Sequence, residues 1–62
     1  MGSIEEAFPI GTKVRTERNV EGVVEDIIYI EGRPYIQVRW RNGSWGVYGK
    51  EEIKRYKIVR VS

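Results

Sequence analysis

Residues 35–48 read YIQVRWRNGSWGVY, and this stretch decides the fold. Asn42-Gly43 stands between two runs in which apolar and polar side chains alternate. Asn-Gly in that setting is typical of a β-hairpin with a two-residue type I′ turn, because both central residues of such a turn need a positive φ. A two-residue loop also fixes the register, so Trp40 is predicted to face Trp45, and Arg39 to face Gly46.

This register divides the hairpin into two faces, because successive side chains of a strand point to opposite sides. The apolar face predicts the core, and it consists of Ile36, Val38, Trp40, Trp45 and Val47. The other face is basic and aromatic, and it consists of Tyr35, Gln37, Arg39, Arg41, Ser44 and Tyr48. The second face is the main functional clue in the chain.

Three further strands are predicted, over residues 12–16, 20–30 and 57–61. The longest of these strands, residues 20–30, contains two adjacent apolar pairs, Val23-Val24 and Ile27-Ile28. Because side chains alternate between the two faces of a regular strand, these four residues cannot all face the core. A bulge or bend near Gly22 or at residues 25–26 is therefore predicted.

Two helical turns are also predicted. Residues 3–7 have the spacing of a capping box and predict a helical turn. Residues 49–55 predict a single 3₁₀ turn that brings Ile53 to the core.

Sixty-two residues make one domain, and no predicted helix is long enough to cover a sheet. The sheet must therefore curl so that its own strands bury its apolar face. We expect an all-β fold, a five-stranded and partly open barrel with a 3₁₀ turn before the last strand. Residues 1–9 form a lead-in and residues 10–62 form the barrel.

The order of these features resembles the SH3-like barrel superfamily. The resemblance rests on Gly11-x-x-Val14, on Gly22-Val23-Val24 and on the segment VRWRNGS at residues 38–44. That segment is similar to the hairpin of Tudor-like barrels. The resemblance implies the barrel fold and a binding role. Tudor domains that bind methylated side chains use an aromatic cage, partly from the loop after the first strand; here that loop, residues 16–19, contains no aromatic residue.

A second resemblance is to the plasmid-borne type II dihydrofolate reductases. Residues 11–15 (GTKVR) and 43–48 (GSWGVY) are similar to two segments of that family. The family has Val-Gln-Ile-Tyr in the second segment, which lines the pore of a tetramer. Tyr48 is kept here, but Gly46 replaces the glutamine and Thr16 replaces a basic residue. With two site residues missing, we expect no reductase activity.

The composition excludes several kinds of chemistry. The chain has no cysteine and no histidine, which excludes zinc sites built from these residues and Ser-His-Asp or Cys-His catalysis. Nothing indicates a cofactor, and we expect a protein that is not an enzyme. No apolar run approaches the roughly 18 residues of a membrane span, so a soluble, cytoplasmic protein is the expectation.

The charges are unevenly distributed along the sequence. Residues 1–32 contain three basic and seven acidic side chains, whereas residues 33–62 contain eight basic and two acidic ones. Such asymmetry is typical of a protein with a polyanionic partner. We therefore expect a small module that binds nucleic acid, DNA in particular, through phosphate contacts and base stacking. The candidate site residues are Tyr35, Arg39, Arg41, Tyr48, Lys50 and Lys57.

Other interpretations stay open. The same face, or an edge of the sheet, is suited to an acidic protein partner. The arginines of that face can instead pair with Glu21 or Glu25 and leave a plain solvated surface. The basic residues Lys54, Arg55 and Arg60 can extend a positive strip with Lys57. An oligomer related to the type II reductases and a designed barrel without a partner are the remaining alternatives.

Overall fold

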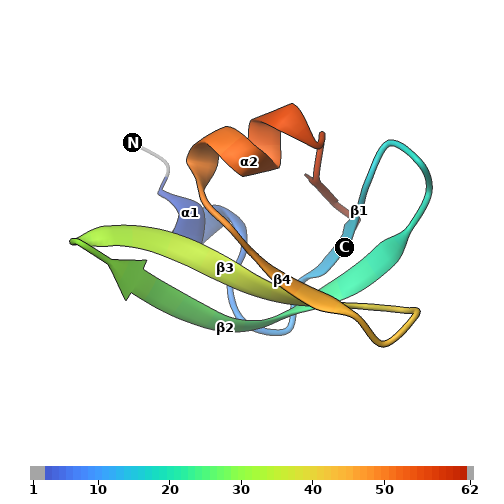
Figure 1. Cartoon of the computed structure of the whole chain (residues 1–62), viewed down its shortest axis with the longest axis horizontal. Coiled ribbons are helices and arrows are strands. Elements are labelled where there is room, and N and C mark those ends of the chain that lie inside the picture. The colour runs from blue at the N-terminus through green and yellow to red at the C-terminus, as the bar shows by residue number, and fades with distance from the viewer. Residues whose placement is uncertain (1–2, 62) are drawn as a thin grey trace.

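A computed structural model describes residues 3–61 as one antiparallel sheet with two short helices (Figure 1). The elements in chain order are α1 (Ile4–Ala7), β1 (Lys13–Arg15), β2 (Glu21–Ile30), β3 (Arg33–Trp40), β4 (Trp45–Tyr48), α2 (Lys50–Arg55) and β5 (Val59–Arg60). The strand order is β4-β3-β2-β1-β5, so β5 returns to pair with β1. The predicted all-β fold of five strands is confirmed, and the barrel is open because β4 and β5 lie at opposite edges.

The long strand β2 contains the predicted bulge. Val24 pairs with Val38, and the next pair is Asp26 with Gln37, so Glu25 is the extra residue. The bulge changes the phase of the strand. Val24 before it and Ile27 after it both face the core, which resolves the two adjacent apolar pairs.

The β3–β4 hairpin has a different register from the predicted one. Trp40 N–H donates to Ser44 O (2.7 Å), and Gly43 N–H donates to Trp40 O (2.9 Å). The loop therefore has three residues, 41–43. Gly43 has a φ of 94°, whereas Asn42 does not have a positive φ, so the type I′ turn is wrong. The geometry is that of a three-residue loop closed by a left-handed glycine.

The one-residue shift exchanges the two faces of β4. Arg39 lies opposite Trp45, and Ile36 lies opposite Tyr48. Tyr48 and Gly46 therefore share the inner side with Trp40, while Trp45 and Val47 point outward. The predicted Trp40–Trp45 pair is wrong, and Trp45 belongs to the surface.

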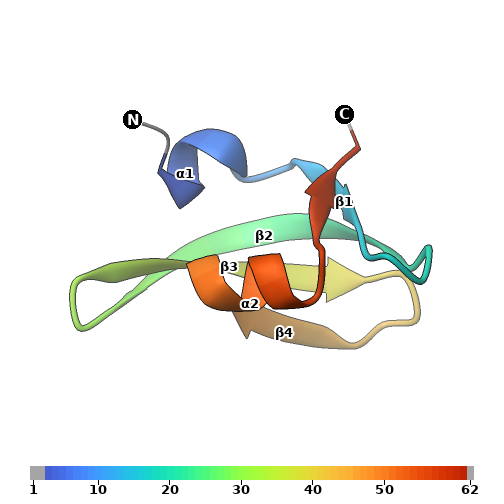
Figure 2. The same ribbon diagram turned by 90° about the horizontal axis from the view of Figure 1, so that it is seen from above.

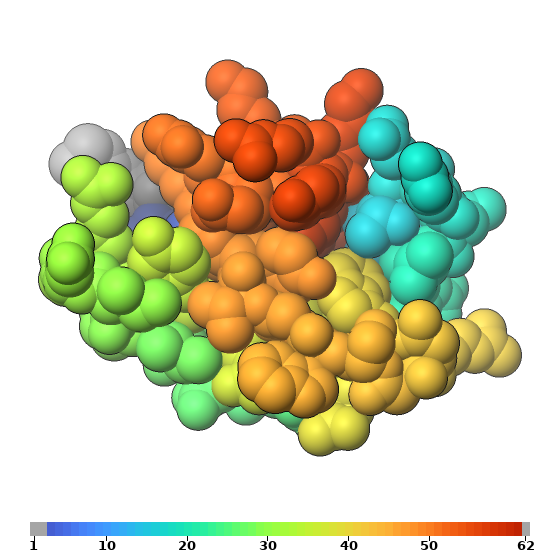
Figure 3. Space-filling model, in the orientation of Figure 1, coloured from blue at the N-terminus to red at the C-terminus, as the bar shows by residue number. Residues whose placement is uncertain are grey.

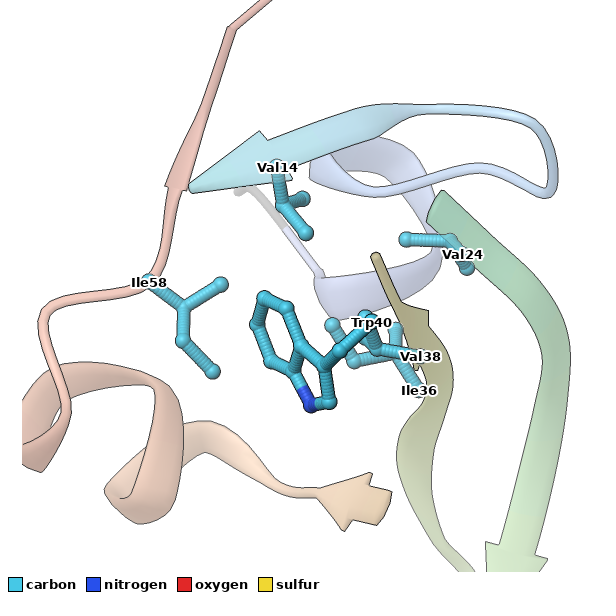
Figure 4. Packing of buried hydrophobic residues seen from close by; sticks show 6 residues of the cluster. All are labelled: Val14, Val24, Ile36, Val38, Trp40 and Ile58. Atoms are coloured by element: carbon cyan, nitrogen blue, oxygen red, sulfur yellow. The ribbon is translucent and has the colours of Figure 1, made fainter. Parts of the chain in front are cut away.

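The core lies inside the curl of the sheet and draws its buried residues from β1, β2, β3 and the segment before β5. Figure 4 shows Trp40 and the five other buried apolar residues of the core, which are Val14, Val24, Ile36, Val38 and Ile58. Trp40 packs directly on Gly22, where an added Cβ would lie 2.6 Å from indole Cε3. This close approach explains why β2 has a glycine at that position.

The two helices lie on the same side of the β2–β3–β4 layer (Figure 1). In Figure 2 the tip of the β2–β3 hairpin extends beyond both of them. The predicted helical turn at residues 3–7 is confirmed as α1. The turn before β5 is a six-residue α-helix rather than a 3₁₀ turn; Glu52 Oε1 accepts a hydrogen bond from Gly49 N–H (3.0 Å) at its start. Ile53 packs against the core, as predicted. No helix within residues 3–61 is long and apolar enough to cross a membrane.

Candidate functional site

The outer face of the sheet is the side opposite the core and the two helices (Figure 1). A row of outward side chains crosses four strands in register, namely Lys13, Val23, Arg39 and Trp45. Trp45 is 61% exposed and Val23 is 40% exposed. In Figure 3, β4 and the β3–β4 turn lie at the surface in the lower part of the molecule, with no other element in front of them. We call the outward side chains of β1–β4, together with Arg41, the outer face.

Charges on the outer face alternate from strand to strand. The basic column on β1 consists of Lys13 and Arg15. The acidic column on β2 consists of Glu21, Glu25 and Asp26. Arg39 and Arg41 form a second basic column on β3 and just after it. Because acidic β2 lies between two basic strands, the charge asymmetry along the sequence does not produce one uniformly positive face.

Among residues 3–61, one ion pair crosses this face. Arg39 Nε donates to Glu25 Oε2 at 2.6 Å, so the bulged residue of β2 is paired with an arginine near the end of β3. Both side chains are partly exposed, and such surface pairs contribute about 0.2–1 kcal/mol. Within residues 3–61, Lys13, Arg15 and Arg41 form no ion pair. Their charges are therefore available to a partner.

The six residues predicted as a nucleic-acid site do not lie together. Arg39 and Arg41 are on the outer face. Tyr35 is half-buried beside Gly49, where a Cβ would lie 2.6 Å from its ring. Tyr48 lies on the inner side of the sheet. The two lysines are elsewhere: Lys50 begins α2, and Lys57 follows α2 and forms an ion pair with Glu17 (3.8 Å).

The shifted register brings together an aromatic cluster that the sequence did not indicate. Trp40 Nε1 donates a hydrogen bond to the Tyr48 hydroxyl (2.8 Å). The two rings meet edge to face with centroids 5.8 Å apart, and Tyr48 meets Tyr56 in the same way at 6.0 Å. The Tyr48 phenol folds over Gly46, where an added Cβ would lie 2.5 Å from the hydroxyl oxygen. An open hollow of about 530 Å³ lies between this cluster and the loop at residues 16–20.

A second hollow, of about 580 Å³, lies between α1 and α2 over the start of β3. Its apolar lining includes Ile4, Phe8 and Ile53, which also pack on the core. Beside it, the Tyr29 hydroxyl donates a hydrogen bond to Glu5 Oε2. This bond lowers the pKa of the Glu5 carboxyl and raises the pKa of Tyr29.

Neither a metal centre nor a known relative identifies the site. Among residues 3–61, no three carboxylates are grouped so that they can hold a metal ion. No protein-family model, no curated protein and no solved structure matches the chain. The resemblances to SH3-like barrels and type II reductases therefore remain predictions from short motifs, and functional argument depends on the surface itself.

Proposed function

We propose that this chain is a non-catalytic protein-interaction module that binds its partner through the outer face. The observation that carries the proposal is the position of Trp45, which is 61% exposed at the end of a row of outward side chains. A tryptophan buries about 150–250 Å², so a partner can remove about 100–150 Å² of this ring from water. At about 25 cal/mol per Å², that contact supplies roughly 2.5–4 kcal/mol of binding free energy.

The surroundings of Trp45 are suited to a protein partner. Val23 and Val47 add apolar area on the same face, and large exposed apolar patches mark interaction sites. Columns of both signs surround this area, and only a partner with charges of both signs complements them. A phosphate backbone would meet the carboxylates of Glu21 and Glu25 between the two basic columns.

A site-specific photo-crosslinker tests this proposal. A photoreactive phenylalanine analogue is placed at position 45, and as the matched control at position 56, where Tyr56 is also exposed but lies on the helical side. After irradiation in an extract of cells that contain the protein, we expect a discrete protein adduct from position 45 only. Equal adducts from both positions, or none from position 45, would count against the proposal.

Nucleic acid is the second candidate, because Lys13, Arg15 and Arg41 lie on the same face as Trp45 and form no ion pair with any of residues 3–61. In this alternative Trp45, rather than Tyr48, is the stacking ring. Titration with single-stranded DNA, RNA and duplex DNA at about 50 mM salt tests it. Binding should weaken with salt, and Arg41→Ser should reduce the salt slope by about one unit. Absence of binding to all three would remove this candidate and leave the protein partner.

A further inference from the structure

The charge columns of the outer face are complementary to a second copy of the same face. Neighbouring strands are about 4.8 Å apart, so the columns of β1, β2 and β3 form a regular pattern of positive, negative and positive charge. A two-fold axis parallel to the strands, between β2 and β3, places β2 of each copy over β3 of the other. The same operation places β1 of each copy over β4 of the other.

The register then gives specific contacts between the copies. Glu21 of each copy lies at the level of Arg41 of the other, because Arg41 N–H donates to Glu21 O within the sheet (2.8 Å) and the two residues share a level. Lys13 of each copy lies over Trp45 of the other, because both belong to one row. An ammonium group over an indole ring is a favourable cation–π contact. Lys13 and Arg41, which form no ion pair within residues 3–61, thus both obtain a partner.

The available area sets the strength of such a dimer. The molecule measures 29 × 21 × 19 Å, so its largest face covers about 600 Å². Standard stable interfaces bury about 800 Å² per partner. Two copies that meet on this face therefore bury less than that, which is typical of weak and reversible association.

We propose that the outer face pairs with the outer face of a second copy to form a weak symmetric dimer. The inference rests on the proposed function, since it names the partner of that same surface. In this dimer the charge columns determine how the two copies align, and Trp45 is the apolar centre of the interface. The axis between β1 and β2 would also pair opposite charges, but it leaves Trp45 at the periphery.

A charge-swap experiment tests the dimer. Sedimentation velocity of the parent chain, from about 10 μM to 1 mM, should show a reversible monomer–dimer equilibrium. Glu21→Lys alone and Arg41→Glu alone should each weaken self-association about tenfold or more, because each places like charges opposite one another. An equimolar mixture of the two variants should restore association as a heterodimer. That recovery also proves that both variants are folded.

The controls separate this inference from the proposed function. Lys54→Glu makes the same charge change as Arg41→Glu on exposed α2 and should leave association unchanged. A parent chain that stays monomeric at about 1 mM overturns the inference, and so does a mixture that fails to recover. If the chain is monomeric but position 45 crosslinks to a different protein, the inference fails and the proposed function stands. If the chain is monomeric and position 45 gives no adduct, both fail.

Discussion

Replacing Tyr48 by phenylalanine should destabilise the domain by about 1–3 kcal/mol. The substitution keeps the ring and its two edge-to-face contacts but removes the oxygen that accepts the Trp40 indole N–H at 2.8 Å. Trp40 is only 8% exposed, so water does not readily replace that acceptor. A buried donor without a partner costs about 1–3 kcal/mol, more than the net value of the bond itself.

Such a loss is large for a chain of this size. At roughly 0.05–0.15 kcal/mol per residue, 62 residues have a free energy of unfolding of about 3–9 kcal/mol. The unfolding entropy of about 2.1 cal/mol/K per residue gives about 0.13 kcal/mol/K for the whole chain. The expected fall in melting temperature is therefore about 8–23 °C.

Urea unfolding followed by circular dichroism, together with a thermal melt, measures the change. Tyr56→Phe is the matched control, because the Tyr56 hydroxyl makes no hydrogen bond within residues 3–61 and the residue is 45% exposed. We expect the control to stay within about 0.5 kcal/mol of the parent. If Tyr48→Phe is equally harmless, the hydrogen bond to Trp40 does not form, and the hairpin register that places it is wrong.

Three further outcomes are expected. Trp40→Ala should cost about 3–5 kcal/mol in urea unfolding, whereas Trp45→Ser should change stability by less than about 1 kcal/mol; equal costs would contradict the outward position of Trp45. Gly22→Ala should cost about 1–3 kcal/mol, because its Cβ would lie 2.6 Å from the indole ring and 2.9 Å from a backbone carbonyl of β3, and a parent-like melting temperature would refute this packing. The hydrogen bond from Tyr29 lowers the pKa of Glu5, so its stabilising effect is present above the ordinary glutamate pKa of about 4.3 and is lost as pH falls through the lowered pKa. The stability difference between the parent and Tyr29→Phe should therefore shrink between pH 6 and pH 3, and a constant difference would contradict the contact.

The sequence predicted the strands and the bulge because both depend on local alternation. Two adjacent apolar pairs in one strand cannot share a face, so Val23-Val24 and Ile27-Ile28 required a change of phase. The structure places that change at Glu25, one of the predicted positions. The capping-box spacing at residues 3–7 likewise located α1 correctly.

The hairpin register could not be decided in the same way. Asn-Gly is compatible with a two-residue type I′ loop and with a three-residue loop, because Gly43 has a positive φ in both. In the structure, Asn42 Oδ1 accepts hydrogen bonds from Ser44 N–H (3.0 Å) and from the Ser44 hydroxyl (2.7 Å), which supports the longer loop. These hydrogen bonds form a local Asx turn, and the alternation of apolar and polar residues contains no information about such a turn.

The sequence also misplaced several residues of the candidate site. The cause lies in strand register and in the order of the strands in the sheet. A one-residue slip places Tyr48 inside and Trp45 outside, so the aromatic residue of the outer face was misassigned. The acidic strand β2 also lies between β1 and β3, which mixes charges that the sequence separates. Neither effect can be read from composition, because both depend on which strands become neighbours.

The bulge at Glu25 also has a consequence for how the gene can change. Deletion of this single codon would remove the extra residue and restore regular alternation along β2, and Val24, Ile27 and Tyr29 would still face inward. The deletion would remove the ion pair between Glu25 and Arg39, but it would leave the core residues and the tyrosine that contacts α1 in place. Related chains should therefore be able to lack one residue at this position and keep the same core pattern.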